Sequence, residues 1–257
     1  NQLIDNLSNA VAHAAAVSME MELARKIQTV LLPDKPEILG YEIAAIMKPS
    51  EEVGGDYYDV ISIGGYDWIV IGDVSGHGVT AGLVMMMVQT AIHTALIGNP
   101  DMPPSRLLSV INRAIYENIE KMGESKHMTI VVLAMGKGGS FSFAGLHEDI
   151  LIRRAETGKV EAVESEGMWI GLKPDISGLL SDDILQLETG DCMVLFTDGI
   201  TEALDSEENL FGDERLVKII EESGGKSASE THRNIIDALE SWEKPDDVTL
   251  VVVKRVE

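Results

Sequence analysis

Four short segments of the chain combine aspartates with glycines or with a second acid, a pattern suited to binding metal ions. They are residues 53–59 (VGGDYYD), 72–78 (GDVSGHG), 196–202 (FTDGITE) and 245–249 (PDDVT). Asp73 and Asp198 each follow an apolar run typical of a buried strand, and each precedes a turn that contains glycine. A carboxylate at a buried strand end is costly to ionise unless a cation or a hydrogen-bond donor compensates its charge. Several such ends that converge would repel one another, and bound divalent cations would remove that repulsion.

Each of these segments has a simpler interpretation when it is taken alone. An isolated Asp-Gly pair usually forms a turn, and Asp73, which precedes an apolar helical stretch, could cap that helix. Four such segments in one acidic chain favour a metal site instead. The neighbouring glycines would let the backbone come close enough for a carbonyl oxygen to join the ligands.

The composition is that of a globular protein with a strong excess of acid. The chain has 257 residues, of which 45% are hydrophobic and 25% charged, and its formal net charge is -23. A phosphate backbone or an anionic membrane would repel such a chain, so we expect neither nucleic acid nor membrane as a partner. The surplus carboxylates are the ligands that Mg²⁺ and Mn²⁺ prefer.

Cys192 is the single cysteine, which excludes a disulfide framework and a thiolate zinc site and favours a reducing, cytoplasmic location. The chain shows no signal-peptide pattern. It begins with Asn1 rather than Met, so we interpret it as a fragment from which an upstream sensor domain is missing. Residues 79–97 are apolar enough to suggest a membrane span, but polar residues interrupt the run and favour a buried helix.

Residues 1–32 are predicted to form one helix, because apolar residues recur at alternating spacings of four and three. This seam consists of Leu3, Leu7, Ala10, Ala14, Val17, Met21 and Ala24. Pro33 and Pro36 end the helix. Two interpretations stay open: an amphipathic helix that lies on its own domain, or a parallel coiled coil that joins two chains into a homodimer.

Short strands and two separate pairs of helices follow this first helix. The strands are predicted at 41–47, 57–63, 68–71, 127–135, 140–144, 150–154, 184–187, 193–197 and 248–253, and the helices at 79–97, 105–122, 213–222 and 227–242. The pattern predicts an α+β fold, with sheets packed on each other and helices outside. We divide the chain into a linker helix at 1–33 and a single domain at 34–257.

The acidic segments resemble those of the PPM family of metal-dependent phosphatases, the protein phosphatase 2C-like enzymes. Within that family they are most similar to the bacterial SpoIIE branch, which includes regulators of sigma-factor partner switching. Segment 72–78 is the most specific match, and the lead-in Ile27-Gln28 and Leu31-Leu32-Pro33 is similar as well. The resemblance runs from about residue 20 to the end. It implies two stacked, mostly antiparallel β-sheets flanked by helices, with the metals at one end.

The resemblance also implies site residues. Asp73 would bridge two divalent cations, Mn²⁺ or Mg²⁺, and the backbone carbonyl of Val74 would complete one shell. Asp56, Asp198 and Asp246 would supply the remaining carboxylates, so that the four aspartates are the predicted catalytic residues.

Two further acids are assigned less directly. Asp247 is kept among the candidate metal ligands, although the family's last ligand aligns best with Asp246. Asp59 is the last residue of the first segment, and the resemblance gives it no definite ligand role.

The activity that the resemblance implies is hydrolysis of phosphoserine or phosphothreonine on a partner protein, in this branch typically an anti-sigma-factor antagonist. Two cations would activate a water and neutralise the phosphoryl group, with no covalent intermediate on the enzyme. The domain would be the output domain of a larger signalling protein.

The sequence departs from the family pattern at three points. Residues 49–53 (PSEEV) hold no basic residue where eukaryotic members carry a phosphate-binding arginine, so the phosphate clamp stays unassigned. His77 favours a turn or cap rather than an acid role, because its spacing from Asp73 is not that of the family's acid histidine. His147 is displaced by one residue from the branch's Ala-Gly-His, and no role is assigned to it.

Two competing functions belong to other classes. A catalytically silent interaction module would be expected to have lost at least one ligand, yet all four acidic segments are intact. Another two-metal hydrolase, such as a phosphodiesterase, would usually mix histidines into the metal shell, and no histidine has such a spacing here.

Overall fold

The computed structural model describes residues 2–33 and 35–257, apart from the side chains of residues 2–5, 7–10, 12, 14 and 17. These residues form two five-stranded sheets in which every neighbouring pair of strands is antiparallel. The first sheet has the order β1 (Tyr41–Lys48), β10 (Val248–Arg255), β9 (Cys192–Phe196), β6 (Ile150–Arg153), β7 (Val160–Val163). The second has the order β2 (Tyr57–Ile63), β3 (Tyr66–Val74), β4 (Met128–Met135), β5 (Ser140–Leu146), β8 (Asp183–Gln186).

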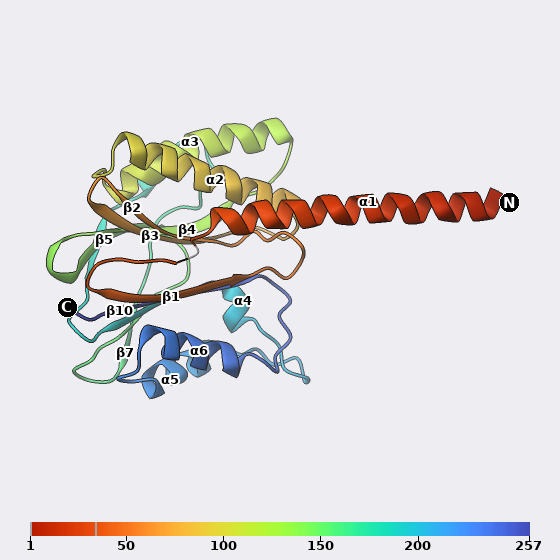
Figure 1. The fold of residues 1–257 in the computed structure, drawn as a ribbon. Coiled ribbons are helices and arrows are strands. Elements are labelled where there is room, and N and C mark those ends of the chain that lie inside the picture. The colour runs from red at the N-terminus through yellow and green to blue at the C-terminus, as the bar shows by residue number, and fades with distance from the viewer. Residues whose placement is uncertain (1, 34) are drawn as a thin grey trace.

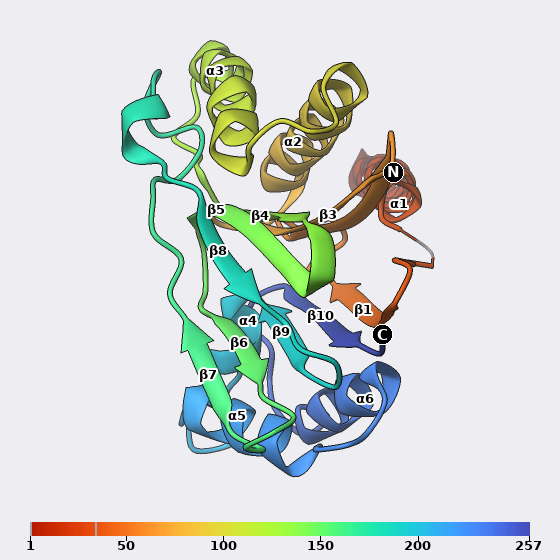
Figure 2. The same ribbon diagram turned by 90° about the vertical axis from the view of Figure 1, so that its left-hand side faces the viewer.

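The sheets stack on each other, and a pair of helices covers each outer face (Figure 1). Helices α2 (Val79–Gly98) and α3 (Pro104–Met122) lie on the second sheet, and α5 (Asp213–Glu222) and α6 (Ala228–Ala238) lie on the first. Figure 2 shows the same order of layers from the side. The predicted α+β class, with stacked antiparallel sheets and helices outside, is confirmed.

Strand β3 shows why the central strands are apolar on both faces. Ile69 and Ile71 pack between the two sheets, whereas Trp68 and Val70 point the other way, into the core beneath α2 and α3. Side chains alternate between the faces of a strand, so a strand that is covered on both sides must be apolar at every position.

Among the described residues, helix α2 is long and apolar enough to cross a membrane, by length and composition alone. The mean hydropathy of its most apolar 18-residue window is 1.5. It lies against the second sheet, where Met85 and Ile92 are fully buried. The neighbouring Met86 and Met87 line an apolar groove of about 710 Å³ between α2 and α3. Of these three consecutive methionines, Met85 therefore packs in the core, and Met86 and Met87 line the groove.

Helix α1 (Gln2–Leu31) is a 30-residue rod that extends well beyond the domain (Figure 1). At 1.5 Å per residue it is about 45 Å long. Most side chains of the predicted heptad seam, from Leu3 to Val17, lie outside the described residues. Near the domain, Met19 and Val30 are exposed. The coiled-coil interpretation of this helix remains a prediction.

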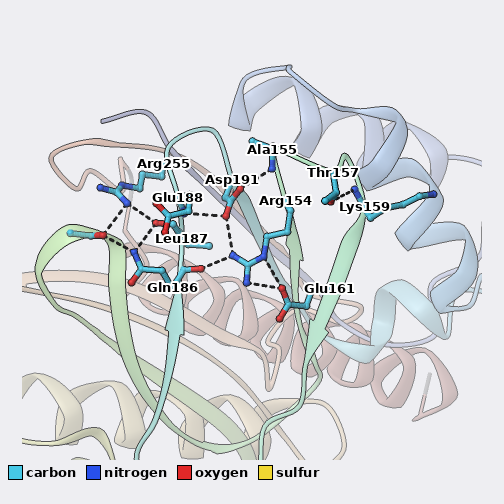
Figure 3. A network of polar contacts seen from close by, with 11 residues as sticks. Arg154, Ala155, Thr157, Lys159, Glu161, Gln186, Leu187, Glu188, Asp191 and Arg255 are labelled. Atoms are coloured by element: carbon cyan, nitrogen blue, oxygen red, sulfur yellow. Dashed lines mark hydrogen bonds and ion pairs between the residues drawn. The ribbon is translucent and has the colours of Figure 1, made fainter.

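A polar network joins the two sheets at the end where β9 begins and β10 finishes (Figure 3). Arg154, which follows β6, donates to the carbonyl of Gln186 on β8 at 2.6 Å and to Asp191 at 2.9 Å. Arg255 donates to the carbonyl of Leu187 at 2.6 Å. This end of the sandwich is closed by guanidinium groups.

Besides shifts of a few residues at strand ends and two short 3₁₀ helices, the structure differs from the expected elements in four places. Asp73 lies inside β3 rather than after a strand, because β3 continues to Val74 in register with β4. Strand β7 and the one-turn helix α4 (Asp198–Thr201) were not predicted, and α6 ends at Ala238 rather than at 242. Strand β7 and helix α4 are each four residues long, too short to be recognised from the local sequence.

Candidate metal centre

The pairing of β2 with β3 brings two of the predicted aspartates together. Tyr57 is the partner of Gly72 in this antiparallel ladder, so Asp56 and Asp73 lie beside each other at the same end of the second sheet. Asp56 is 1% exposed, and Asp73 is half-buried. The register of one hairpin therefore fixes half of the predicted site.

The other two predicted aspartates come from the first sheet. Strand β9 ends at Phe196, two residues before Asp198, and β10 begins two residues after Asp246. The two strands pair with Leu250 opposite Phe196, which places both carboxylates at one end of that sheet.

Electrostatics show that these four aspartates, with Asp247, share one region. Burial first, and then the charges of Asp56, Asp198, Asp246 and Asp247, raise the pKa of Asp73 to about 9. Burial, together with Asp247 and Asp198, raises the pKa of Asp56 to about 8 against the opposing hydrogen bonds of two threonines. The pKa of Asp198 is raised too, by burial and then by Glu202 and Asp246. Ionising all of them together is unfavourable unless a cation joins them.

The carboxylates share one region without forming a closed shell of metal ligands. Among the described residues, no three acidic, histidine or cysteine side chains are gathered tightly enough to hold an ion as they stand. The donor set consists of oxygen atoms, which suits the hard cations Mg²⁺ and Mn²⁺ and not a zinc site of thiolates or imidazoles.

Asp56 is held by hydroxyl groups from the opposite sheet. Thr197 and Thr249 both donate to its Oδ2, at 2.8 Å and 2.6 Å. The two threonines also bond each other. The amide of Thr249 donates to the Thr197 hydroxyl oxygen at 3.0 Å, and the amide of Thr197 donates to the Thr249 carbonyl at 3.1 Å. The other oxygen of Asp56, Oδ1, accepts no hydrogen bond from the described residues and is available for a cation.

Asp247 differs from its neighbour Asp246, because backbone groups occupy both of its oxygens. The amide of Ser50 donates to Oδ1 at 2.6 Å, and the amide of Gly55 donates to Oδ2 at 2.7 Å. Asp247 is 2% exposed, whereas Asp246 is half-buried and faces the shared acidic region. Asp247 therefore ties the loop before Asp56 to the start of β10.

Gly55 keeps the backbone carbonyl of Val74 accessible. A Cβ atom at Gly55 would stand 2.8 Å from that carbonyl oxygen and 3.2 Å from Oδ1 of Asp73. Any side chain there would fill the space between the two predicted ligand atoms. The two atoms that border this space are a carbonyl oxygen and a carboxylate oxygen, the kinds of ligand that Mg²⁺ and Mn²⁺ prefer.

Two residues of the acidic segments, Asp59 and His77, bond groups other than the proposed metal ligands. Asp59 accepts hydrogen bonds from the hydroxyl of Tyr57 at 2.8 Å and from Nε2 of His93 on α2 at 2.7 Å, so it fastens β2 to that helix. His77 lies at the surface, with Nδ1 2.8 Å from Glu51.

The structure brings three further residues to this end that the motifs did not identify as functional. Gln28 of α1 bonds the backbone of Gly54. Lys126 donates to the carbonyl of Ser75 at 2.6 Å, next to Val74. His147 bonds groups of both sheets. Their partners are distant in sequence, so spacing along the chain carries no signal for them.

Comparison with known proteins places this architecture in a family. The family model described as Stage II sporulation protein E (SpoIIE) matches residues 64–256. The phosphoserine phosphatase RsbU of Bacillus subtilis is 30% identical over 245 residues, covering 93% of this chain and 71% of RsbU.

Solved structures show the same fold. The SiaA-PP2C domain of Pseudomonas aeruginosa superposes with a TM-score of 0.82 at 22% identity, covering 96% of this chain and 99% of that chain. A structure of RsbX in complex with magnesium gives a TM-score of 0.63 at 13% identity, covering 84% and 96%. The chain belongs to the SpoIIE family of PP2C-type serine/threonine phosphatase domains.

Proposed function

We propose that this domain removes phosphate from phosphoserine or phosphothreonine on a partner protein, using two bound divalent cations. The strongest support is that Asp56, Asp73 and Asp198 converge. Burial and the charges of neighbouring acids raise the pKa of all three carboxyl groups. Such a cluster stores an electrostatic cost that divalent cations relieve. Neither a silent interaction module nor a site built on histidines accounts for it.

The proposed ligands are Asp56, Asp73, Asp198, Asp246 and the carbonyl of Val74, with Asp73 bridging both ions. Mn²⁺ and Mg²⁺ both suit these oxygens, and a magnesium ion is present in the RsbX structure. Bound cations would supply the Lewis acidity that activates a water and neutralises the phosphoryl group.

The chain's own residues orient these ligands. Thr197 and Thr249 fix the rotamer of Asp56, and so leave Oδ1 directed to the site. We assign Asp247, which the sequence had placed among the metal ligands, to the support of the loop that carries Gly55. Holding ligands in place before binding reduces the ordering that metal binding requires.

The partner is proposed to be a small phosphorylated protein of the anti-sigma-factor-antagonist type, since RsbU is a phosphoserine phosphatase. The strong negative charge argues against nucleic acid and anionic membrane as ligands of this domain. A cytoplasmic location follows from the same proposal, because such partners act inside the cell.

We further propose that residues 1–33 form a linker helix and that 34–257 form the phosphatase domain, with an upstream sensor domain acting through α1. Met19, Leu23 and Val30 of α1 are 72%, 58% and 81% exposed, and they lie outside the predicted heptad seam. This exposed apolar face supports a second helix, from another copy of the chain, as its partner.

The direct test is release of phosphate from a phosphoserine protein and from a generic aryl phosphate, with Mn²⁺ and with EDTA. The proposal predicts turnover that requires the metal and returns when the metal is restored. Turnover that continues in EDTA, or its absence at every Mn²⁺ and Mg²⁺ concentration, contradicts it.

A further inference from the structure

His147 reaches from the second sheet to the first at the end that carries the aspartates. It follows β5, in the second sheet, and its ring Nδ1 lies 2.9 Å from the hydroxyl oxygen of Thr129 on β4. Its Nε2 lies 3.0 Å from the carbonyl oxygen of Phe196, the last residue of β9 in the first sheet. One imidazole ring therefore joins the two sheets.

The hydrogen-bond roles of the ring follow from its partners. A carbonyl oxygen can only accept, so Nε2 carries the proton and donates to Phe196. Burial lowers the pKa of His147 to about 4, which leaves the ring neutral and makes Nδ1 the acceptor of the Thr129 hydroxyl proton. The Thr129 hydroxyl also lies 3.4 Å from the carbonyl of Asp73, but the 2.9 Å contact with Nδ1 is the shorter one.

The backbone of His147 is fixed as firmly as its ring. Its amide donates to the hydroxyl oxygen of Ser165 at 2.9 Å, and that hydroxyl donates back to the carbonyl of His147 at 2.7 Å. Ser165 is 6% exposed. Ser165 therefore holds in place the backbone from which the ring extends.

The two ring partners are next to proposed ligands. Thr129 is the direct cross-strand partner of Asp73 in the ladder between β3 and β4. Phe196 precedes Asp198 by two residues and faces Leu250 of β10, the strand that follows Asp246. A change in the length of the His147 bridge would alter the separation between Asp73 on one sheet and Asp198 on the other.

Two other ties at this end pass through acids, the proposed ligand Asp56 and the supporting residue Asp247. The His147 bridge contains no carboxylate, so its geometry does not depend on the charge state of the acids. At the opposite end, Arg154 and Arg255 fasten the sheets independently.

We infer that His147 is a positioning residue, which sets the distance between the strands carrying Asp73 and Asp198 and thereby the affinity for divalent cations. The inference rests on the proposed metal site. It assigns His147 no contact with substrate and no proton transfer.

The test measures Mn²⁺ binding by calorimetry on the full chain, together with the midpoint of thermal unfolding. His147→Asn keeps an acceptor where Nδ1 stands, and His147→Gln keeps a donor where Nε2 stands, so each retains one arm of the bridge. Thr129→Val removes one arm with little change of shape. Arg154→Met is the matched control, since it breaks an inter-sheet bond at the far end.

Both His147 variants and Thr129→Val are expected to weaken Mn²⁺ binding by about tenfold or more, as loss of groups that orient metal ligands does. Arg154→Met should lower the unfolding midpoint without changing the Mn²⁺ dissociation constant. Ring ¹⁵N shifts should show a neutral imidazole with its proton on Nε2.

If the His147 variants lower the unfolding midpoint but bind Mn²⁺ as the wild type does, the residue is merely structural and the inference is wrong. A ring protonated on Nδ1 also overturns it. If the wild type itself binds no Mn²⁺, the proposed metal site fails and this inference fails with it.

Discussion

Gln28 of α1 makes two hydrogen bonds with the backbone of Gly54: its Nε2 donates to the Gly54 carbonyl at 2.7 Å, and its Oε1 accepts from the Gly54 amide at 3.1 Å. Gln28 is 1% exposed, on a helix whose neighbouring residues are mostly exposed. Gly54 stands two residues before Asp56. These two bonds connect the rod directly to the loop that presents a proposed ligand, so we expect a rotation or shift of α1 to move that loop.

Replacing Gln28 with alanine leaves both backbone groups of Gly54 buried without partners. We expect a loss of about 1–3 kcal/mol in the free energy of unfolding, and a higher Mn²⁺ concentration for half-maximal phosphate release. Denaturant titration and a metal-dependence assay measure the two effects. Lys26→Ala, two residues away on the exposed side of the helix, should change neither. Unaltered metal dependence in Gln28→Ala would mean that α1 does not control the loop.

The adjacent acids Asp246 and Asp247 should behave differently when each is changed to asparagine. Asp246→Asn should raise the Mn²⁺ dissociation constant by about tenfold or more, because Asp246 is a proposed ligand. It should not lower the metal-free stability, because it removes one of the mutually repelling charges. Asp247→Asn should cost about 1–3 kcal/mol of stability, because an amide nitrogen cannot accept from the Ser50 or Gly55 amides. Calorimetry with Mn²⁺ measures the dissociation constant of each variant, and thermal unfolding in EDTA measures its metal-free stability. The reverse pattern would exchange the two assignments.

Apolar alternation is a local signal, and it predicted the layers and most of the strands. The resemblance to the PPM family singled out the four aspartates, whose role as metal ligands stays a prediction. It did not predict β7, whose sequence VEAV is too short and too polar to identify before it pairs with β6. It also could not predict how Asp56 is held, since Thr249 is 193 residues away. His147 received no role from the sequence because it is displaced by one residue from the branch's Ala-Gly-His. Its partners are set by how the two sheets stack, which spacing along the chain does not encode.

The pair formed by His93 and Asp59 should make stability depend on pH. The hydrogen bond with Asp59 raises the pKa of His93 above its ordinary value, against the effect of burial. The folded state therefore holds this proton more tightly, so the pair stabilises fully below the unfolded pKa of about 6.5 and loses its contribution as pH rises through the raised folded value. The difference in unfolding midpoint between wild type and His93→Gln should be largest in acid and shrink in alkali. His77→Gln, at an exposed pair, is the control, and a difference that grows with pH would contradict the sign.

Removing residues 1–20 tests the proposed role of α1 as a dimer-forming linker. The shortened chain keeps Gln28 and its bonds to Gly54 but loses most of the heptad seam. We expect a dimer by light scattering for the full chain and a monomer for the shortened one, with a changed rate or Mn²⁺ requirement. A shortened chain that is still dimeric and equally active would place the regulatory contact elsewhere.

The most direct test of the account is phosphate release by Asp73→Asn under saturating Mn²⁺, beside Asp67→Asn as a control on the same strand. Removing a carboxylate that bridges two cations should cost several kcal/mol of transition-state stabilisation with little change of volume, so the Asp73 variant should be nearly inactive yet folded. The Asp67 variant, whose partner is the Ser62 hydroxyl, should retain full activity. Activity of Asp73→Asn within about threefold of the wild type would contradict the two-metal assignment.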